Sequence, residues 1–380
     1  MTRGYSEAAQ DLTVLRASMA GFNGVAPGPV IRVRRNDEVR VRLVNDLDEP
    51  TALHWHGVRT PNAMDGGVPL TGAPVAPGAS FEYRFEVSDA GTFWYRAALR
   101  TQQESGLYGA LIVTELASPP ADQDRVLIFG ERRSGRDGTR EFTLNGVSAL
   151  DVPVRTNERL RLRFVNASAR QVMNGRIESH RVIVMALDGE PAEPFASRHG
   201  RIVLGPGNRA DVFVDATLAP GSVAPIMFAQ NGSDPPVLRM VYAETPARSM
   251  PLGEPAPLPA NPLPARMNFS RALRVVLAVE GSNAAPPIRM PLFSAERGRT
   301  VVMALDNRDI GAHVVHVHGH HFRLLDRLDD GWKPYWLDTV VVESRQTARI
   351  AFVADNPGRW LIERHALDGP AVGADWFEVR

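Results

Sequence analysis

Histidine is the residue whose spacing suggests chemistry in this chain. Two histidines form an early pair, His54 and His56. Five more form a later cluster at His313, His316, His318, His320 and His321. Imidazole suits copper and zinc as a ligand, so seven of the ten histidines are placed for a transition metal. The chain has no cysteine, which removes the thiolate that blue electron-transfer copper sites require.

Extended backbone would bring these side chains together. Residues i and i+2 of a strand point to one face of a sheet, so His54 and His56 should project together. The later cluster contains a second set at that spacing, His316, His318 and His320. One His-X-His pair is weak evidence because surface histidines are common, whereas two clusters near opposite ends of a chain predict a shared metal site. The alternative, a hydrogen-bonded core histidine, is our interpretation of the isolated His180 and His199.

Most of the chain alternates apolar and polar residues with a period of two, as β-strands do. The segments are short, rich in Val and Ile, and separated by Gly, Pro, Asn and Asp, which is typical of sandwiches or barrels. They span residues 30–33, 38–44, 81–87, 111–113, 159–165, 202–204, 210–214, 274–279, 300–305 and 347–353. We therefore predict an all-β fold.

One motif recurs three times along the sequence. A turn precedes a strand of alternating basic and apolar residues that ends in Asn at residues 34–45 and 155–166, and more weakly at 296–307. Repetition at about a domain length predicts three homologous β-domains. A Ser-Pro-Pro run and a later proline-rich stretch separate them. The predicted domains are 1–116, 120–245 and 267–380, with 246–266 as an extended linker.

Composition limits the partners of the protein. The formal net charge is zero, so no excess of basic residues favours nucleic acid or an anionic membrane. Without cysteine the chain can form no disulfide framework, thiol nucleophile or Cys-based zinc site. No apolar run approaches the roughly 18 residues of a spanning helix, and Met1–Ala20 lacks the residue order of a signal peptide. We expect no membrane span, and a protein that either stays inside the cell or has lost a leader.

Several motifs resemble those of the multicopper oxidases, the superfamily of laccase and bilirubin oxidase. Those of the first two domains are Leu53–Gly57, Asp65–Gly66, Gly91–Tyr95, Gly106–Val113 and Leu204–Asp211. Those of the last domain are His313–His320 and Gly358–Ile362. The resemblance spans the whole chain. It implies three cupredoxin-like Greek-key β-sandwich or barrel domains, metal between the first and third, and a periplasmic or secreted location.

The same resemblance implies metal ligands, residue by residue. The family's trinuclear centre has eight imidazoles, of which five positions are kept: His54, His56, His316, His318 and His365. Among these, His54 and His316 match ligands of the type 2 copper, and the other three match ligands of the type 3 pair. His313 matches one ligand of the type 1 copper, and His320 matches a histidine that is not usually a ligand.

The chain departs from the family at two of four histidine motifs. Arg96–Ala98 stands where the family has His-X-His, and a guanidinium stays protonated and cannot replace a neutral imidazole. Glu363–His365 stands where the family has His-Cys-His, and Gly369 and Ala374 occupy the positions of the second type 1 His and the axial Met. The type 1 centre should therefore be absent. Laccase-like turnover is not expected, because no relay would carry electrons inward.

Two acids have alternative roles. Arg96 and Glu363 replace ligands that would line one cavity, so we predict a buried ion pair, in which each charge offsets much of the other's burial cost. The competing role for Glu363 is that of a metal ligand or a general base beside a metal-bound water. Asp65 matches an acid that relays protons in the family, although Asp-Gly is also an ordinary turn.

The five kept histidines predict one or two ions of copper or zinc and no blue type 1 copper. The first functional hypothesis is a metalloenzyme that acts on a small-molecule substrate by hydrolysis, a lyase reaction or inner-sphere oxidation, with Asp65 or Glu363 as the base. The second is a copper-free, non-catalytic scaffold that binds a protein partner. The third is copper binding without turnover, which the lack of a dense Met-rich insert disfavours.

Overall fold

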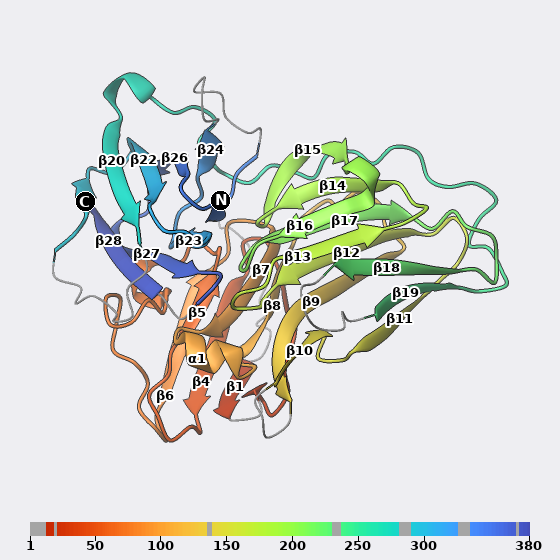
Figure 1. Ribbon diagram of the computed structural model, residues 1–380, viewed down its shortest axis with the longest axis horizontal. Coiled ribbons are helices and arrows are strands. Elements are labelled where there is room, and N and C mark those ends of the chain that lie inside the picture. The colour runs from red at the N-terminus through yellow and green to blue at the C-terminus, as the bar shows by residue number, and fades with distance from the viewer. Residues whose placement is uncertain are drawn as a thin grey trace, which may run out of the picture.

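Strands dominate the computed structural model, which describes residues 13–18, 21–134, 139–229, 237–280, 290–325, 335–369 and 372–380. They form six sheets that pack as three pairs (Figure 1). Every predicted segment overlaps an observed strand, so the all-β prediction is confirmed. The domain limits stay predictions, and most of the segment considered for a leader lies outside the described residues. Within the described residues, no helix combines the length and apolar character needed to cross a membrane.

The first unit packs two four-stranded sheets around one apolar core. One sheet has the order β2 (Gly21–Phe22), β1 (Thr13–Ser18), β4 (Glu38–Asn45) and β6 (Ser80–Glu86). The other has the order β3 (Ile31–Arg34), β8 (Tyr108–Thr114), β7 (Gly91–Ala97) and β5 (Leu53–His56). Two short helices, η1 (Asn62–Met64) and α1 (Arg100–Glu104), follow β5 and β7.

The second unit has larger sheets and one short 3₁₀ helix, η2 (Arg198–Gly200). Its six-stranded sheet has the order β10 (Thr139–Leu144), β9 (Gln123–Ser134), β12 (Arg159–Asn166), β17 (Arg209–Asp215), β14 (Val182–Leu187) and β15 (Glu190–Ala196). Its five-stranded sheet has the order β11 (Ala149–Val154), β19 (Val237–Tyr242), β18 (Val223–Ala229), β13 (Met173–Ile177) and β16 (Arg201–Leu204).

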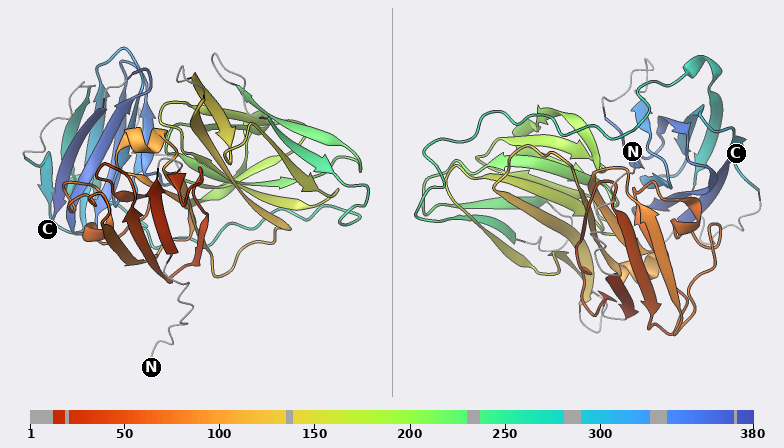
Figure 2. Two further views of the ribbon diagram at one scale, coloured as in Figure 1. Left: turned by 90° about the horizontal axis from the view of Figure 1, so that it is seen from below. Right: turned by 180° about the vertical axis from the view of Figure 1, so that it is seen from behind.

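The third unit follows η3 (Phe269–Arg271). One sheet has the order β20 (Leu273–Val279), β22 (Arg299–Asn307), β26 (Thr347–Ala354) and β24 (Arg323–Leu325). The other has the order β21 (Phe293–Ala295), β28 (Val372–Val379), β27 (Gly358–Ala366), β23 (His313–Val317) and β25 (Thr339–Val342). The chain between β19 and β20 reaches this unit by running along the second unit (Figure 2), where Leu258 packs into an apolar cluster.

The repeated motif found in the sequence forms β4, β12 and β22, and its final asparagine has the same role each time. Asn45, Asn166 and Asn307 are at most 2% exposed. Each accepts a hydrogen bond from the backbone N–H two residues later and donates its Nδ2 to two or more carbonyls of neighbouring segments. A buried amide with this full set of partners fixes the strand end. The three strands are therefore equivalent in structure as well as in sequence.

The basic residues of the repeat have different surroundings in the first two units. Arg40 and Arg42 of β4 are exposed, whereas Arg161 and Arg163 of β12 are buried and contact Glu115 and Thr92 of the first unit. Arg161 donates to both oxygens of Glu115, at 2.7 and 2.9 Å, and to Asp211 at 2.6 and 3.1 Å. A charged strand face thus becomes an interface between units, because acids on both sides neutralise it.

Glu115 gives this interface a dependence on pH. Burial would raise the pKa of Glu115, but hydrogen bonds and charge from Arg161 outweigh it and lower the pKa from 4.5 to about 2. The ionised Glu115 carboxylate therefore stabilises the folded protein fully above pH 4.5, and this stabilisation is lost as the pH falls toward 2. We expect Glu115→Gln to cost about 3 kcal/mol of unfolding free energy at pH 7, and progressively less below pH 4.5, in urea unfolding experiments. A cost that is constant down to pH 2 would contradict this ion pair's role.

Candidate metal centre

Residues of the two histidine clusters lie close together in the interior, on or next to strands of the first and third units. His54 and His56 lie on β5, His316 lies on β23, and His318 follows the end of β23. All four are at most 3% exposed. In the ladders, His54 lies opposite Arg96 of β7, and His316 lies opposite Glu363 of β27.

Three imidazoles converge with the geometry of a metal site. The Nε2 atoms of His54 and His316 are 3.2 Å apart, and the ring centroids of His54 and His318 are 4.0 Å apart. One ligand nitrogen from each of the three residues lies within 4.8 Å of the others. The Nε2 of His318 is buried and has no hydrogen-bond partner. A buried imidazole nitrogen without a partner, beside two more, fits the donor set of a copper or zinc ion.

The Nδ1 atoms of the same three histidines make hydrogen bonds on the side away from the cluster. That of His54 lies 2.9 Å from the backbone oxygen of Asp65. That of His318 lies 2.8 Å from the carboxylate Oδ2 of the same residue. That of His316 lies 3.0 Å from both the backbone oxygen of Asp338 and the hydroxyl of Thr339. These contacts leave each Nε2 directed to the centre, as in histidine ligands of metalloproteins whose second nitrogen is hydrogen-bonded.

The protonation states follow from burial and from the two nearby carboxylates. Burial is the largest factor that lowers the pKa of His54 and His316, so both imidazoles are neutral at pH 7. Burial would also lower the pKa of His318, but the charges of Asp65 and Glu363 outweigh it and raise the pKa to about 9. Without a metal His318 is therefore protonated at pH 7, and an ion would displace the proton from its Nε2.

His56 and His365, the other two expected ligands, lie differently. The ring of His56 stacks on that of His316, with centroids 3.6 Å apart, and its Nε2 lies 2.9 Å from the Thr339 hydroxyl and 3.3 Å from Asp338. His56, His316 and Asp338 form a second group of potential ligands. His365 belongs to neither group, although its Nε2 is buried without a hydrogen-bond partner.

Arg96 and Glu363 form the ion pair that the sequence suggested. Arg96 Nη2 donates to Glu363 Oε2, and the side chains are 7% and 26% exposed. Glu363 Oε1 also lies 3.5 Å from the Nε2 of His318. Burial would raise the pKa of Glu363, but Arg96 and His318 outweigh it and hold the pKa well below its usual range. Glu363 is thus an ionised carboxylate beside the three imidazoles.

Removing the carboxylate from this pair should destabilise the protein. We expect Glu363→Ala to cost about 1 to 3 kcal/mol because it leaves the guanidinium of Arg96 without its charged acceptor. Glu363→Gln keeps an acceptor oxygen and should cost less. Thermal unfolding of the metal-free proteins measures the difference, and equal melting temperatures for the two variants would contradict a stabilising ion pair.

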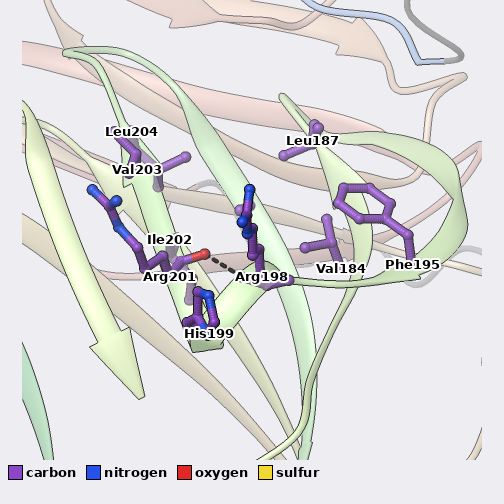
Figure 3. A pocket seen from close by; sticks show the side chains of 11 residues that line it. Val184, Leu187, Phe195, Arg198, His199, Arg201, Ile202, Val203 and Leu204 are labelled. Atoms are coloured by element: carbon purple, nitrogen blue, oxygen red, sulfur yellow. Dashed lines mark hydrogen bonds between the residues drawn. The ribbon is translucent and has the colours of Figure 1, made fainter. Parts of the chain in front are cut away.

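A cavity of about 270 Å³ adjoins these residues at the junction of the three units. The histidines and charged residues that line it are His56, His316, His365, Arg96, Arg100, Arg364 and Glu363. A small molecule there would meet an imidazole of the cluster directly. A larger hollow of about 610 Å³ on the second unit is lined by Arg198, His199, Arg201 and apolar side chains (Figure 3). One imidazole without a lining carboxylate makes that hollow a poor metal site.

Two interpretations from the sequence are wrong. His320 does not share a face with His316, because β23 ends at Val317 and Gly319 turns the chain at φ +64°, so its ring packs among Phe352, Trp360 and Phe377. Nor are the lone histidines of the second unit both core residues. His180 is half-buried against Tyr242 and the carbonyl of Glu178, and His199 is exposed.

Three residues match the positions of the family's type 1 copper ligands, and the structure shows their surroundings. His313 is buried, and its Nε2 lies 2.8 Å from a carboxylate oxygen of Asp309. Gly369 supplies no side-chain donor, and Ala374 lines the cavity with a methyl group. The donor set does not fit a blue copper, which needs a thiolate and two imidazoles.

Our sequence reasoning missed Asp338 and Thr339, which support His56 and His316. It also missed Arg209, whose guanidinium donates to both oxygens of Asp338, at 2.9 and 2.7 Å. The one available signal was an Asp-Thr pair directly before the apolar run Val340–Val342. These residues come from two units, so only the folded arrangement places them beside the histidines.

Comparisons with known proteins give one consistent assignment. Three family models, each described as multicopper oxidase, match residues 5–118, 85–224 and 257–368. The multicopper oxidase MmcO of Mycobacterium tuberculosis is 27% identical over 90% of this chain and 79% of its own length. The structure of a multi-copper oxidase from Pseudomonas thermotolerans has a TM-score of 0.86 and 29% identity, covering 97% of this chain and 99% of that chain.

Lac15, from a marine microbial metagenome, is similar to the same extent. Its structure has a TM-score of 0.83 and 31% identity, and the match covers 97% of this chain and 100% of that chain. Together with the paired sheets, these matches confirm the predicted all-β fold with three cupredoxin-like Greek-key sandwich domains. The chain belongs to the multicopper oxidase family.

Proposed function

We propose that this protein binds one or two copper or zinc ions at the residual trinuclear-type histidine cluster and lacks a type 1 copper. The proposal rests on the convergence of His54, His316 and His318. The Nε2 atoms of His54 and His316 are 3.2 Å apart, and that of His318 has no hydrogen-bond partner. His56 and His365, which line the cavity, complete the ligands for a second ion.

The missing type 1 ligands decide how a substrate would react. Without a thiolate centre, electrons from a molecule at the surface have no route inward, so a substrate must enter the cavity beside His316. We therefore propose a non-laccase metalloenzyme for small molecules, acting by hydrolysis, a lyase reaction or inner-sphere oxidation. A bound ion would supply Lewis acidity and would lower the pKa of a coordinated water.

Two acids have distinct proposed roles. Glu363 lines the cavity and is ionised, so it is the carboxylate positioned to accept a proton from a molecule bound there. Asp65 is fully buried behind His318 and accepts from its Nδ1, so it acts by orienting the ligand. A periplasmic or secreted location is also a proposal, and it rests on family membership.

Asp65→Asn tests the orienting role. Loss of a hydrogen-bonded carboxylate behind a histidine ligand typically weakens metal binding about 10- to 100-fold. We expect a loss of that size for zinc or copper, measured by competition with a chelator, with little change in the far-ultraviolet circular dichroism. Unchanged affinity in a folded variant would contradict the placement of His318 as a ligand.

The proposed access route is tested with copper-loaded protein and azide, a small anion that binds copper. Azide should change the copper electron paramagnetic resonance spectrum, and a substituted phenol should not be oxidised over many turnovers. Ala374→Phe, which fills the cavity, should suppress the azide effect without loss of copper. Ala278→Phe on β20, outside the cavity, is the matched control.

The alternatives correspond to other outcomes of the same experiment. Copper that is bound but insensitive to azide would favour copper binding without turnover. Failure to bind copper or zinc in excess would favour the copper-free scaffold. Sustained phenol oxidation would contradict the absence of a type 1 relay.

A further inference from the structure

A third group of potential metal ligands lies where all three units meet, and its His321 Nε2 is 3.7 Å from the carboxylate of Asp338. Asp89 precedes β7 in the first unit, Glu190 begins β15 in the second, and His321 lies between β23 and β24 in the third. One ligand atom from each lies within 4.8 Å of the others. The three side chains are 4%, 1% and 1% exposed. The group shares no residue with the ligands proposed above.

Two of these side chains have polar atoms without partners. Neither ring nitrogen of His321 makes a hydrogen bond, and neither does Oε1 of Glu190. His321 Nε2 and Glu190 Oε1 are 3.6 Å apart, which is too long for a hydrogen bond. The separation is close to the roughly 3.3 Å expected between two ligands of one tetrahedral ion with bonds of about 2.0 Å. Buried polar atoms without partners are rare and costly, and an ion between them would satisfy both.

Neighbouring residues hold the two carboxylates in place. Arg59 donates to both oxygens of Asp89, each at 2.7 Å. Asn261, in the segment between β19 and β20, donates to Glu190 Oε2 at 3.0 Å, which leaves Oε1 directed at His321. Outer contacts of this kind orient the ligands of protein metal sites.

Burial disfavours a charge on Glu190 and on His321 while no cation is bound. Burial, the largest factor, raises the pKa of Glu190 well above its usual range. Burial also lowers the pKa of His321 to about 4, so the imidazole is neutral and available as a ligand. Arg59 neutralises Asp89, so one negative charge remains to be matched when Glu190 ionises.

We propose that Asp89, Glu190 and His321 form a second divalent-cation site, of the zinc class, that ties the three units together. One imidazole and two carboxylates suit zinc, whereas calcium takes six to eight oxygen ligands. Because each ligand comes from a different unit, the ion stabilises their arrangement and has no need of contact with a substrate.

Zinc content and melting temperature of the 380-residue chain test this proposal. After metal removal and reconstitution, His321→Ala and the near-isosteric Glu190→Gln should each bind one zinc ion fewer per chain than the wild type. The exposed His199→Ala is the matched control and should lose none. The double variant His54→Ala/His316→Ala, which disrupts the histidine cluster, should still bind one zinc ion, and zinc should still raise its melting temperature.

The two sites can therefore fail separately. Equal zinc content in the wild type and in folded Glu190→Gln would overturn the junction site whatever the state of the histidine cluster. A double variant that binds no zinc would overturn it as well. Circular dichroism identifies a variant that has not folded, and the second substitution then decides.

Discussion

Replacing Arg209 by methionine should lower the free energy of unfolding by about 3 to 5 kcal/mol, because it leaves a buried carboxylate without its partner. The guanidinium is fully buried between the three units. It donates to both oxygens of Asp338 and to the backbone oxygens of Thr92, Gly207 and Asp188, at 2.7 to 3.1 Å. Methionine has a similar length and no donor, so Asp338 would lose its charged partner and three carbonyls would lose a donor.

Arg209→Met should also disturb the histidine cluster, because Asp338 contacts two of its residues. Asp338 contacts His56 through its carboxylate and His316 through its backbone oxygen. Arg239→Met is the matched control, because Arg239 forms an exposed ion pair with Asp151, and the substitution should leave the free energy of unfolding almost unchanged. Urea unfolding measures both variants. Similar costs for the two would show that the junction of the units does not depend on Arg209.

The largest effect on metal binding should come from the double variant His54→Ala/His316→Ala. Both Nε2 atoms of the 3.2 Å pair are then lost. The affinity of the cluster should fall by more than the roughly 100-fold that loss of an outer contact can cause. Copper and zinc content after dialysis measures the change.

His180→Ala is the matched control for that loss. This histidine is half-buried in the second unit, and its nitrogens contact Glu178 and Tyr242. The variant should keep the full metal content of the wild type. If the double variant also keeps every ion, the cluster is not the metal site.

Local patterns in the sequence predicted the strands and the repeat. Alternating residues identified β4, β12 and β22, since the period of a strand is a local property. They could not show that Arg161 is buried, because Glu115 pairs with it only after the first two units pack. The burial of a charge depends on partners that are distant in sequence.

The sequence predicted those site residues whose spacing along a strand determines where their side chains point. His54 and His316 meet because each lies on a strand beside the junction of two units. His320 turns away because Gly319 takes a positive φ, which spacing alone does not reveal. The roles of Asp338 and Glu190 depend on contacts between units, and no local pattern encodes those.

Copper titration of the metal-free wild type, followed by elemental analysis and visible absorption, shows how many copper ions the protein binds and whether any is a blue copper. We expect one or two copper ions bound in the histidine cluster and no intense thiolate-to-copper band. No bound copper under excess metal, or an intense blue band, would contradict this expectation.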